Sequence, residues 1–507
     1  MMHQTRREFL GQAAAAMAVA GALRSGEAQA REARRFPTVP WAQDELDALD
    51  ALGLAALVAR RKVSAAELLD RALRRAAAIA SLNAITVNDV SVGALAAVAG
   101  SASGPFAGVP FLLKDLAVEL YGTRTTNGSR FFADQAPATR DGELVRRFKA
   151  AGLVIFGKTA SPELGLSPST ESAVHGATRN PWNPDHIAGG SSGGAAVAVA
   201  AGVVPMAHAS DGGGSIRIPA ACCGLFGLKP SRGRVPFPNR HFEGWGGLST
   251  QFAVTRSVRD AAALLDAVAG PAPGATAPER PPPGSFLAAT RARPGKLRIA
   301  VLRQPLNGGP VDAECATALE NAARLCARLG HTVVDARPTI DVAGWQSAFG
   351  TLVAVGIARA LDERGKALGR ACTEHDVEPM TWLIAQSAKG IGGSAYAAAL
   401  DMRDLVSAQM AAFHEDYDLL LSPTLAEPPP RLGVLVLSAD PAAFAAQATR
   451  FSPYTSLANL TGQPAMSLPL HRTASGLPVG LMFQGRYGED ARLLTLAAQL
   501  ERAQAEG

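Results

Sequence analysis

The stretch GGSSGG, residues 189–194, leads straight into the apolar segment AAVAVAA at 195–201, and DGGGSIRIP follows at residues 211–219. Glycine loses more conformational freedom on folding than any other residue, so runs of it beside serine need a physical reason. One reason is that bare backbone N–H groups must approach a ligand closely, and the alternative for either segment alone is a tight turn. Ser191 and Ser215 are 24 positions apart, and two such segments so close together favour a shared site.

A lysine upstream has an equally unusual setting. Lys114 ends the apolar run in GVPFLLKD, residues 108–115, which makes its ammonium group a candidate for burial. The alternative for a single lysine is a solvated surface position. Burial without full pairing lowers the pKa of a lysine by up to several units. A neutral amine can then act as a base towards a serine hydroxyl.

Around these segments, short apolar runs alternate with helical patterns and glycine-rich turns. Ser64 and Glu67 form a capping box at the start of one predicted helix. Alternation of this kind predicts an α/β layer architecture with helices on both faces of a sheet. Helices are predicted at 44–60, 64–80, 143–151, 195–201 and 313–329, and strands at 153–156, 203–207, 297–302 and 332–334.

The N-terminus has the pattern of an export signal, residues 1–30. TRREFL at 5–10 is a twin-arginine motif, an apolar stretch follows at 11–23, and AQA at 28–30 supplies a cleavage signature. A membrane anchor is the alternative, but the apolar stretch is shorter than the ~20 residues that a spanning helix needs. The sequence therefore predicts an exported protein, periplasmic or secreted, with no membrane association after the signal is removed.

Composition limits the class of protein and the kinds of partner that the sequence predicts. The chain has 507 residues, 48% hydrophobic and 18% charged, which is typical of a folded protein with a large core. The net charge of +5 is spread without basic clusters, so no nucleic-acid partner is predicted. The five cysteines form no CxxC pair and no Cys/His spacing that fits zinc, so no metal is predicted. A Pro-rich surface connection is expected at 271–284.

Two other motifs are formally present. GGSSGG also satisfies the GxSxG nucleophile elbow of α/β-hydrolases, which would place the reactive hydroxyl on Ser191 or Ser192. That fold would need a downstream acid and histidine, and it leaves the segment at 211–219 unexplained. GLVIFGKT at 152–159 fits the Walker A spacing, but its four middle residues are apolar and strand-like, so ATP binding is not predicted.

Taken together, these segments resemble the amidase signature family. The resemblance covers roughly residues 40–500 and includes the segments GVPFLLKDL (108–116), GKTASPELG (157–165), HGATRNPW (175–182), GGSSGG (189–194), GGGSIRIPAACCGLFGLKPSRGRV (212–235), NLTGQPAMSLPL (459–470) and GLPVGLMFQG (476–485). It implies one large domain, residues 31–507, with a three-layer α/β/α sandwich around a large mixed central sheet.

The resemblance also implies roles for individual residues. Ser215 would be the nucleophile, Ser191 a bridging serine that follows a cis peptide bond, and Lys114 the base at the end of the relay. Backbone N–H groups of the glycine loop would form an oxyanion hole, for which donors must lie at hydrogen-bond distance from the developing charge. The oxyanion-hole residues are Gly212, Gly213 and Gly214, and the supporting residues are Ser192, Asp211 and Arg217.

The implied reaction is hydrolysis of a small-molecule amide through an acyl-enzyme, without metal or cofactor. Several segments are similar to the branch that includes 6-aminohexanoate cyclic-dimer hydrolases. A peptide amidase, an aryl acylamidase and a catalytically silent binding homologue remain as alternatives. The subunit that releases ammonia for tRNA-dependent amidation is disfavoured by the export signal. A homodimer is expected at the level of the family only.

Overall fold

The computed structural model describes residues 44–87, 103–239, 241, 243–275 and 284–506. The expected export signal, residues 1–30, lies outside this range, as do residues 276–283 of the expected Pro-rich connection. Residues 271–275, at the start of that connection, lie at the surface. Within the described ranges, no helix is both long enough and apolar enough to cross a membrane.

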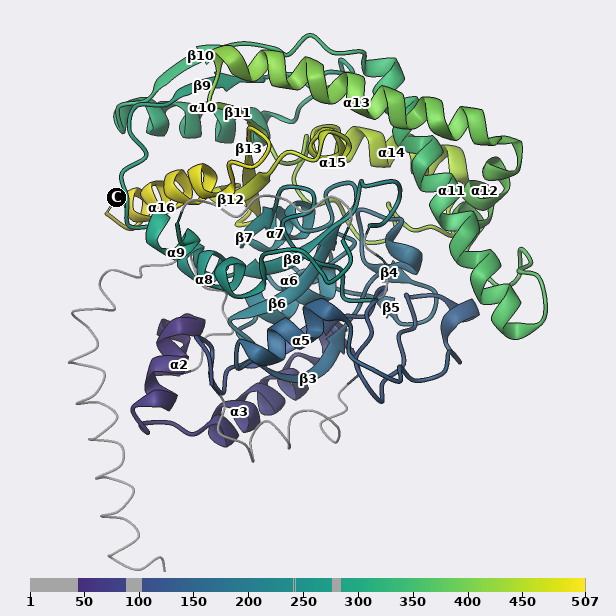
Figure 1. Cartoon of the computed structure of the whole chain (residues 1–507). Helices are drawn as coiled ribbons and strands as arrows, with labels where there is room; N and C mark the ends of the chain where they lie inside the picture. Colours follow the sequence, from purple (N-terminus) through teal and green to yellow (C-terminus); the bar gives the residue numbers. More distant parts are fainter. Residues whose placement is uncertain (1–43, 88–102, 240, 242, 276–283, 507) are drawn as a thin grey trace, which may run out of the picture.

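A mixed sheet of eight described strands forms the centre of the molecule (Figure 1). Its first three strands run parallel, and each later neighbour is antiparallel to the one before. In spatial order the strands are β10 (Thr332–Asp335), β9 (Arg298–Val301), β11 (Leu419–Pro423), β13 (Pro478–Gly485), β12 (Ala465–Arg472), β7 (Phe226–Lys229), β8 (Thr250–Thr255) and β6 (Met206–Asp211).

A smaller sheet continues this layer beyond the β6 edge. It contains β1 (Ile85–Val87), β3 (Val154–Thr159) and β2 (Pro110–Lys114), in that order. β2 lies against β6, and a hydrogen bond joins the Lys114 N–H to Nδ1 of His208 at 3.2 Å. The remaining strands, β4 (Glu171–Ser172) and β5 (Gly176–Ala177), pair only with each other.

Helices cover both faces of the large sheet. Successive side chains of a strand point to opposite faces, and β13 shows the result. A Cβ at Gly480 would meet Ala221 of α7 (Arg217–Cys223), whereas one at Gly485 would meet Leu493 of α16 (Asp490–Glu506). The sandwich expected from the sequence is confirmed.

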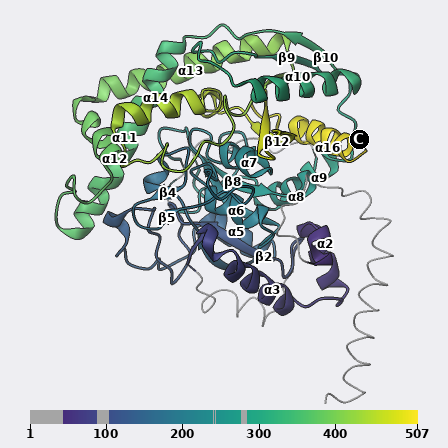
Figure 2. The ribbon, with the colours of Figure 1, turned by 180° about the vertical axis from the view of Figure 1, so that it is seen from behind.

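The other helices fall into two groups. Those around the sheets are α2 (Ala51–Ala59), α3 (Ala65–Ala78), α5 (Glu143–Ala150), α6 (Gly193–Ala200), α8 (Val258–Val268), α9 (Phe286–Ala289) and α10 (Ala313–Arg328). A separate helical group contains α11 (Val342–Leu368), α12 (Pro379–Ser387), α13 (Gly393–Asp416), α14 (Pro441–Phe451) and α15 (Ser456–Thr461). In the view from behind, this group lies on one side of the sheet (Figure 2). The N-terminal helices α2 and α3 lie below the sheet in the same view.

Most predicted elements are confirmed, with two corrections. The single helix predicted at 44–60 is a 3₁₀ turn, Glu45–Ala48, followed by α2. Asp50 separates them, because its extended backbone and its side-chain bond to the Gly53 N–H begin a new helix. The strand predicted at 203–207 begins only at Met206. The N–H of Val203 bonds to Ala198 O and closes the end of α6 instead.

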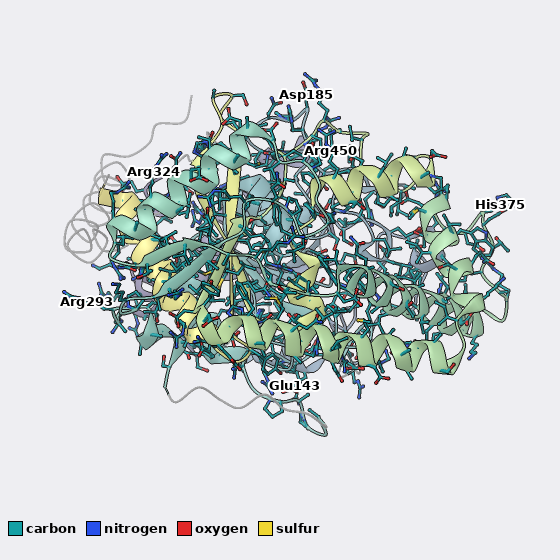
Figure 3. The ribbon with its side chains drawn as sticks, turned by 90° about the horizontal axis from the view of Figure 1, so that it is seen from above. Glu143, Asp185, Arg293, Arg324, His375 and Arg450 are labelled. Atoms are coloured by element: carbon teal, nitrogen blue, oxygen red, sulfur yellow. The ribbon has the colours of Figure 1, made fainter. Side chains whose placement is uncertain are left out.

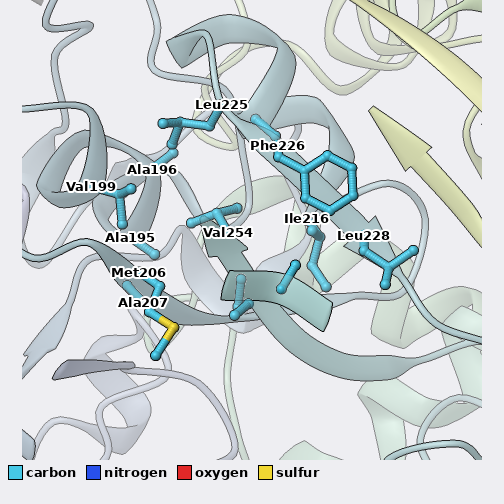
Figure 4. Close-up of a cluster of buried hydrophobic side chains, with 14 of the residues drawn as sticks. Ala195, Ala196, Val199, Met206, Ala207, Ile216, Leu225, Phe226, Leu228 and Val254 are labelled. Atoms are coloured by element: carbon cyan, nitrogen blue, oxygen red, sulfur yellow. The ribbon is translucent and has the colours of Figure 1, made fainter. Parts of the chain in front are cut away.

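Small side chains allow α6 to lie deep in the core. All of its residues are buried, and it packs on β6 and β8. Figure 4 shows Ala195, Ala196 and Val199 of α6 within a cluster of buried apolar side chains. A Cβ at Gly194 would meet the backbone of Ala84 and Ala160, so glycine is required for this close approach. The N-terminus of α6, which directly follows Ser191 and Ser192, therefore lies close against the backbone at Ala84 and Ala160.

Charged side chains of both signs lie around the rim of the molecule. Figure 3 labels Arg293, Arg324, Asp185, Arg450 and His375, which are all exposed. This mixture agrees with the even charge distribution in the sequence.

Candidate active site

The candidate site is built around Lys114, at the carboxyl end of β2. Its side chain is fully buried, and its Nζ lies 2.7 Å from Ser191 Oγ and 2.9 Å from Ser210 Oγ. β2 ends beside β6, and β6 presents His208 and Ser210 on one face because side chains two positions apart share a face. The lysine expected to be buried is therefore buried, and it contacts one of the two predicted serines directly.

Burial also sets the charge of this lysine. Loss of hydration lowers the pKa of Lys114 to about 7, although the negative charge of Asp211 opposes this shift. A substantial fraction of the amine is therefore neutral near pH 7. A neutral Nζ has a lone pair that accepts a hydrogen bond from a serine hydroxyl.

GGSSGG positions the two serines differently. The peptide bond between Gly190 and Ser191 is cis, as the resemblance implies. The hydroxyl of Ser192 is within hydrogen-bond distance of both the N–H and the carbonyl of Ser210, at 3.3 and 3.2 Å. Ser192 thus joins the start of α6 to the end of β6. Ser191 and Ser192 are both buried, and no described strand leads into them, so this segment lacks the strand–turn–helix geometry of a nucleophile elbow.

Ser215 lies between the glycine loop and α7. It is partly exposed, in contrast to Ser191, and its hydroxyl has no hydrogen-bond partner among the described residues. The structure thus brings Lys114, Ser191 and Ser210 into direct contact, while the predicted bond between Ser191 and Ser215 is not formed. Catalytic hydrogen bonds are often long before a substrate is bound.

The glycine loop offers fewer free donors than expected. The N–H of Gly214 already donates to Asp211 Oδ1 at 2.8 Å. Across the described part of the chain, the N–H groups of Gly212, Gly213 and Ser215 have no internal acceptor. Two of the three predicted glycine donors therefore remain available to a ligand, together with the N–H of Ser215.

Asp211 and Arg217 support this loop as a buried pair. Both are fully buried, and the guanidinium Nε and Nη2 donate to the two carboxylate oxygens at 3.0 and 2.9 Å. Burial by itself would raise the pKa of Asp211, but Arg217 lowers it to about 2. Arg217 also donates to Thr455 O and to Asn459 Oδ1, at 2.8 and 2.7 Å. Asp211 and Arg217, for which a supporting role is predicted, are thus bonded to each other and to segments around the loop.

Replacement of Arg217 by methionine is expected to lower the free energy of unfolding by about 3–5 kcal/mol, because it leaves the Asp211 carboxylate buried without its partner. Denaturant unfolding followed by circular dichroism measures this loss. Arg324→Met, at an exposed position of α10, is the matched control, with an expected change within about 0.5 kcal/mol. Equal stability of the two variants would contradict the supporting role.

Three functional neighbours were missed from the sequence: Ser210, His208 and Asn459. His208 is fully buried, and its Nε2 lies 3.1 Å from Gln251 Oε1. Burial lowers the pKa of His208 to about 3, so the ring is neutral and fixes the end of β2 through Nδ1. Alternation along β6 would have placed His208 and Ser210 on one face. Asn459 is 248 positions from Asp211, whose carboxylate it contacts at 2.8 Å, and only the fold brings them together.

The site's side chains are suited to moving protons. Among the described residues, no group of three or more His, Cys, Asp or Glu side chains is arranged to hold a metal ion. The fold and the lysine–serine arrangement define a class of mixed α/β hydrolases in which a buried amine lies beside serine hydroxyls.

Comparison with known proteins makes the class specific. The Amidase family model matches residues 65–494, and the chain belongs to this family of amide hydrolases. A 6-aminohexanoate-cyclic-dimer hydrolase from Paenarthrobacter ureafaciens is 38% identical over 469 residues, 90% of this chain and 94% of the relative.

Solved structures agree. The structure of a 6-aminohexanoate cyclic dimer hydrolase complexed with substrate superposes with a TM-score of 0.85 at 37% identity, covering 90% of this chain and 97% of that one. A bacterial aryl acylamidase of the amidase signature family gives a TM-score of 0.81 at 28% identity, covering 90% and 96%. The fold expected from the sequence is therefore confirmed.

Proposed function

We propose that this enzyme hydrolyses carboxamides through an acyl-enzyme on Ser215, with Ser191 and Lys114 as the proton relay. The observation that carries the proposal is the 2.7 Å contact between Nζ of the fully buried Lys114 and Ser191 Oγ. A serine hydroxyl is a weak nucleophile at its ordinary pKa and needs an adjacent base. A lysine with a pKa of about 7 is matched to that task at neutral pH.

In the acylation step, the Ser215 oxygen forms a bond to the amide carbonyl carbon. Its proton passes to Ser191 Oγ, and the Ser191 proton passes to the neutral Nζ of Lys114. Return of a proton along the same path to the amide nitrogen breaks the C–N bond and releases the amine. Water then attacks the acyl-enzyme with the same relay as base and releases the carboxylic acid.

The negative charge on the carbonyl oxygen needs donors that are not otherwise engaged. The N–H groups of Gly212, Gly213 and Ser215 meet this requirement, whereas that of Gly214 bonds to Asp211. Preorganised donors of this kind are each worth about 3 kcal/mol of transition-state stabilisation. Because Asp211 is itself fixed by Arg217, the loop does not need to reorganise during the reaction.

We propose linear or cyclic amides of small carboxylic acids as the substrates. Relatives whose names specify a cyclic dimer of 6-aminohexanoate support this range, as does the similarity to an aryl acylamidase. A peptide amidase is the alternative within the family, and a catalytically silent binding homologue is the alternative outside it.

The proposal is tested by acid-quenching the enzyme during turnover of a panel of amides and measuring the mass of the peptide that contains Ser215. The panel contains a 6-aminohexanoate cyclic dimer, an acyl anilide and a C-terminally amidated dipeptide. We expect an adduct of the acyl group on Ser215 with at least one of them. Turnover with the adduct on Ser191 or Ser192 would overturn the assignment, and the absence of both adduct and turnover across the panel would favour the binding homologue.

A further inference from the structure

Trp245 lies directly against the nucleophile loop. A Cβ built on Gly212 would lie 2.7 Å from Cζ3 and 2.9 Å from Cε3 of the indole, so the ring occupies the space where a side chain at position 212 would be. The other edge of the indole contacts Gly356 of α11. Trp245 is therefore wedged between the loop that carries Ser215 and the separate helical group.

The backbone of Trp245 has an unusual conformation. Its φ is 53°, in the left-handed region, where a bulky residue is a genuine outlier. Gly246 and Gly247 follow with φ values of 60° and 88°. The two glycines adopt such conformations readily, whereas for Trp245 the cost is about 1–3 kcal/mol, and the conformation persists only when the surrounding structure determines it.

Hydrogen bonds supply that support. Arg403 Nη1 donates to Gly246 O at 3.0 Å, and Arg232 Nε donates to Gly247 O at 2.6 Å. Nδ2 of Asn459 donates to Leu248 O at 3.1 Å and also to Asp211 Oδ1 at 2.8 Å. The segment that carries Trp245 and the loop that carries Ser215 are thus tied to the same buried amide.

A second aromatic ring extends the surface. A Cβ built on Gly213 would lie 3.1 Å from Cζ of Phe349, which is one helical turn before Leu352 and two before Gly356 on α11. Trp245, Phe349, Gly213 and Ser215 are all partly exposed, whereas Gly212 and Gly214 are buried. Ser215, Trp245 and Phe349 are thus all partly exposed, and each aromatic ring lies against a glycine of the loop that carries Ser215.

We infer that Trp245 and Phe349 form an apolar wall that binds an uncharged, apolar part of the substrate next to the scissile carbonyl. This inference rests on the proposed function of Ser215 and adds a substrate class to it: amides with an aliphatic or aromatic acyl group. Desolvation of an apolar group against aromatic rings favours binding, whereas a charged group would lose hydration against the same rings. Trp245 is a specificity-determining residue in this arrangement.

The test compares 4-nitroanilides of acetic, hexanoic and 6-aminohexanoic acids. We expect the wild-type enzyme to prefer the hexanoyl substrate to both others. Trp245→Ala is expected to lower kcat/KM for hexanoyl by about 10- to 100-fold, mainly through KM, and for acetyl by less than about threefold. Trp245→Phe should retain most of the preference. Trp182→Ala removes a partly buried indole bonded to Cys223 at the far end of α7 and is the matched control.

Labelling of Ser215 with a small fluorophosphonate separates the possible failures. A wild-type protein that takes no label at Ser215 would refute the proposed nucleophile, and the wall with it. Equal labelling of wild type and Trp245→Ala, together with an unchanged preference for hexanoyl over acetyl, would overturn the wall alone. An equal loss for all three substrates in both Trp245 variants would also overturn it, because it would indicate a purely structural role.

Discussion

Replacement of Ser215 by alanine is expected to lower kcat for amide hydrolysis by at least about 10⁴-fold, with the fold intact. The chemical reason is that no other hydroxyl in the loop can form the acyl-enzyme. The structural reason is that the Ser215 side chain has no hydrogen-bond partner among the described residues. Its loss therefore leaves no buried polar group unsatisfied. Release of amine at saturating substrate measures the effect, and thermal unfolding checks the fold.

The control for this variant is a serine outside the site. Ser387, at the end of α12, is exposed and bonds only to Ile384 O within the described structure. Ser387→Ala is expected to retain full activity. Turnover by Ser215→Ala within tenfold of wild type would assign the nucleophile to another residue, and Ser191 would be the first alternative because it contacts the lysine directly.

The sequence predicted those parts of the site that lie in contiguous motifs. Lys114 was expected to be buried because an apolar run precedes it, and it is. The helix predicted from the pattern of 195–201 is present as α6, which begins two residues earlier, at Gly193 within GGSSGG. The amidase signature fold followed from motifs spread over most of the chain. In each case, a local pattern carries the information.

Contacts between distant segments could not be predicted in the same way. Ser210 supports Lys114 from another strand, and Asn459 reaches Asp211 from near the C-terminus. Trp245 meets Gly212 only because a left-handed turn brings it there. The Gly214 N–H was expected in the oxyanion hole, but its bond to Asp211 depends on loop geometry that the letters GGG do not specify. These features depend on tertiary structure and not on local pattern.

The electrostatic balance of the site also depends on the fold. Arg217 takes both carboxylate oxygens of Asp211, so the acid is only partly available to stabilise a charged Lys114. Lys229, another fully buried lysine, has its pKa lowered to about 7 by burial and by Arg217. Burial and the shortage of free negative charge thus both lower the pKa of Lys114. Both favour the neutral amine that the proposed relay requires.

Replacement of Lys114 by methionine is therefore expected to lower kcat/KM by about 10²- to 10⁴-fold, the usual contribution of a general base. In the wild type, the base must be neutral. Because the pKa of Lys114 is about 7, kcat/KM should fall about tenfold per pH unit below that value and level off above it. Lys114→Met should lose this inflection. Lys114→Arg should be equally inactive at every pH, because a guanidinium stays protonated.

Lys158 offers the matched control within the same chain. It is also buried, its pKa is lowered by burial to about 8, and its Nζ bonds to Thr125 Oγ1 at 2.8 Å and not to Ser191. Lys158→Met should keep the inflection near pH 7 even if it lowers stability, which thermal unfolding would reveal. If the inflection near pH 7 survived in Lys114→Met, or vanished in a folded Lys158→Met, the base would not be Lys114. Loss of the inflection in the Lys114 variants alone would assign the titration to the amine beside Ser191.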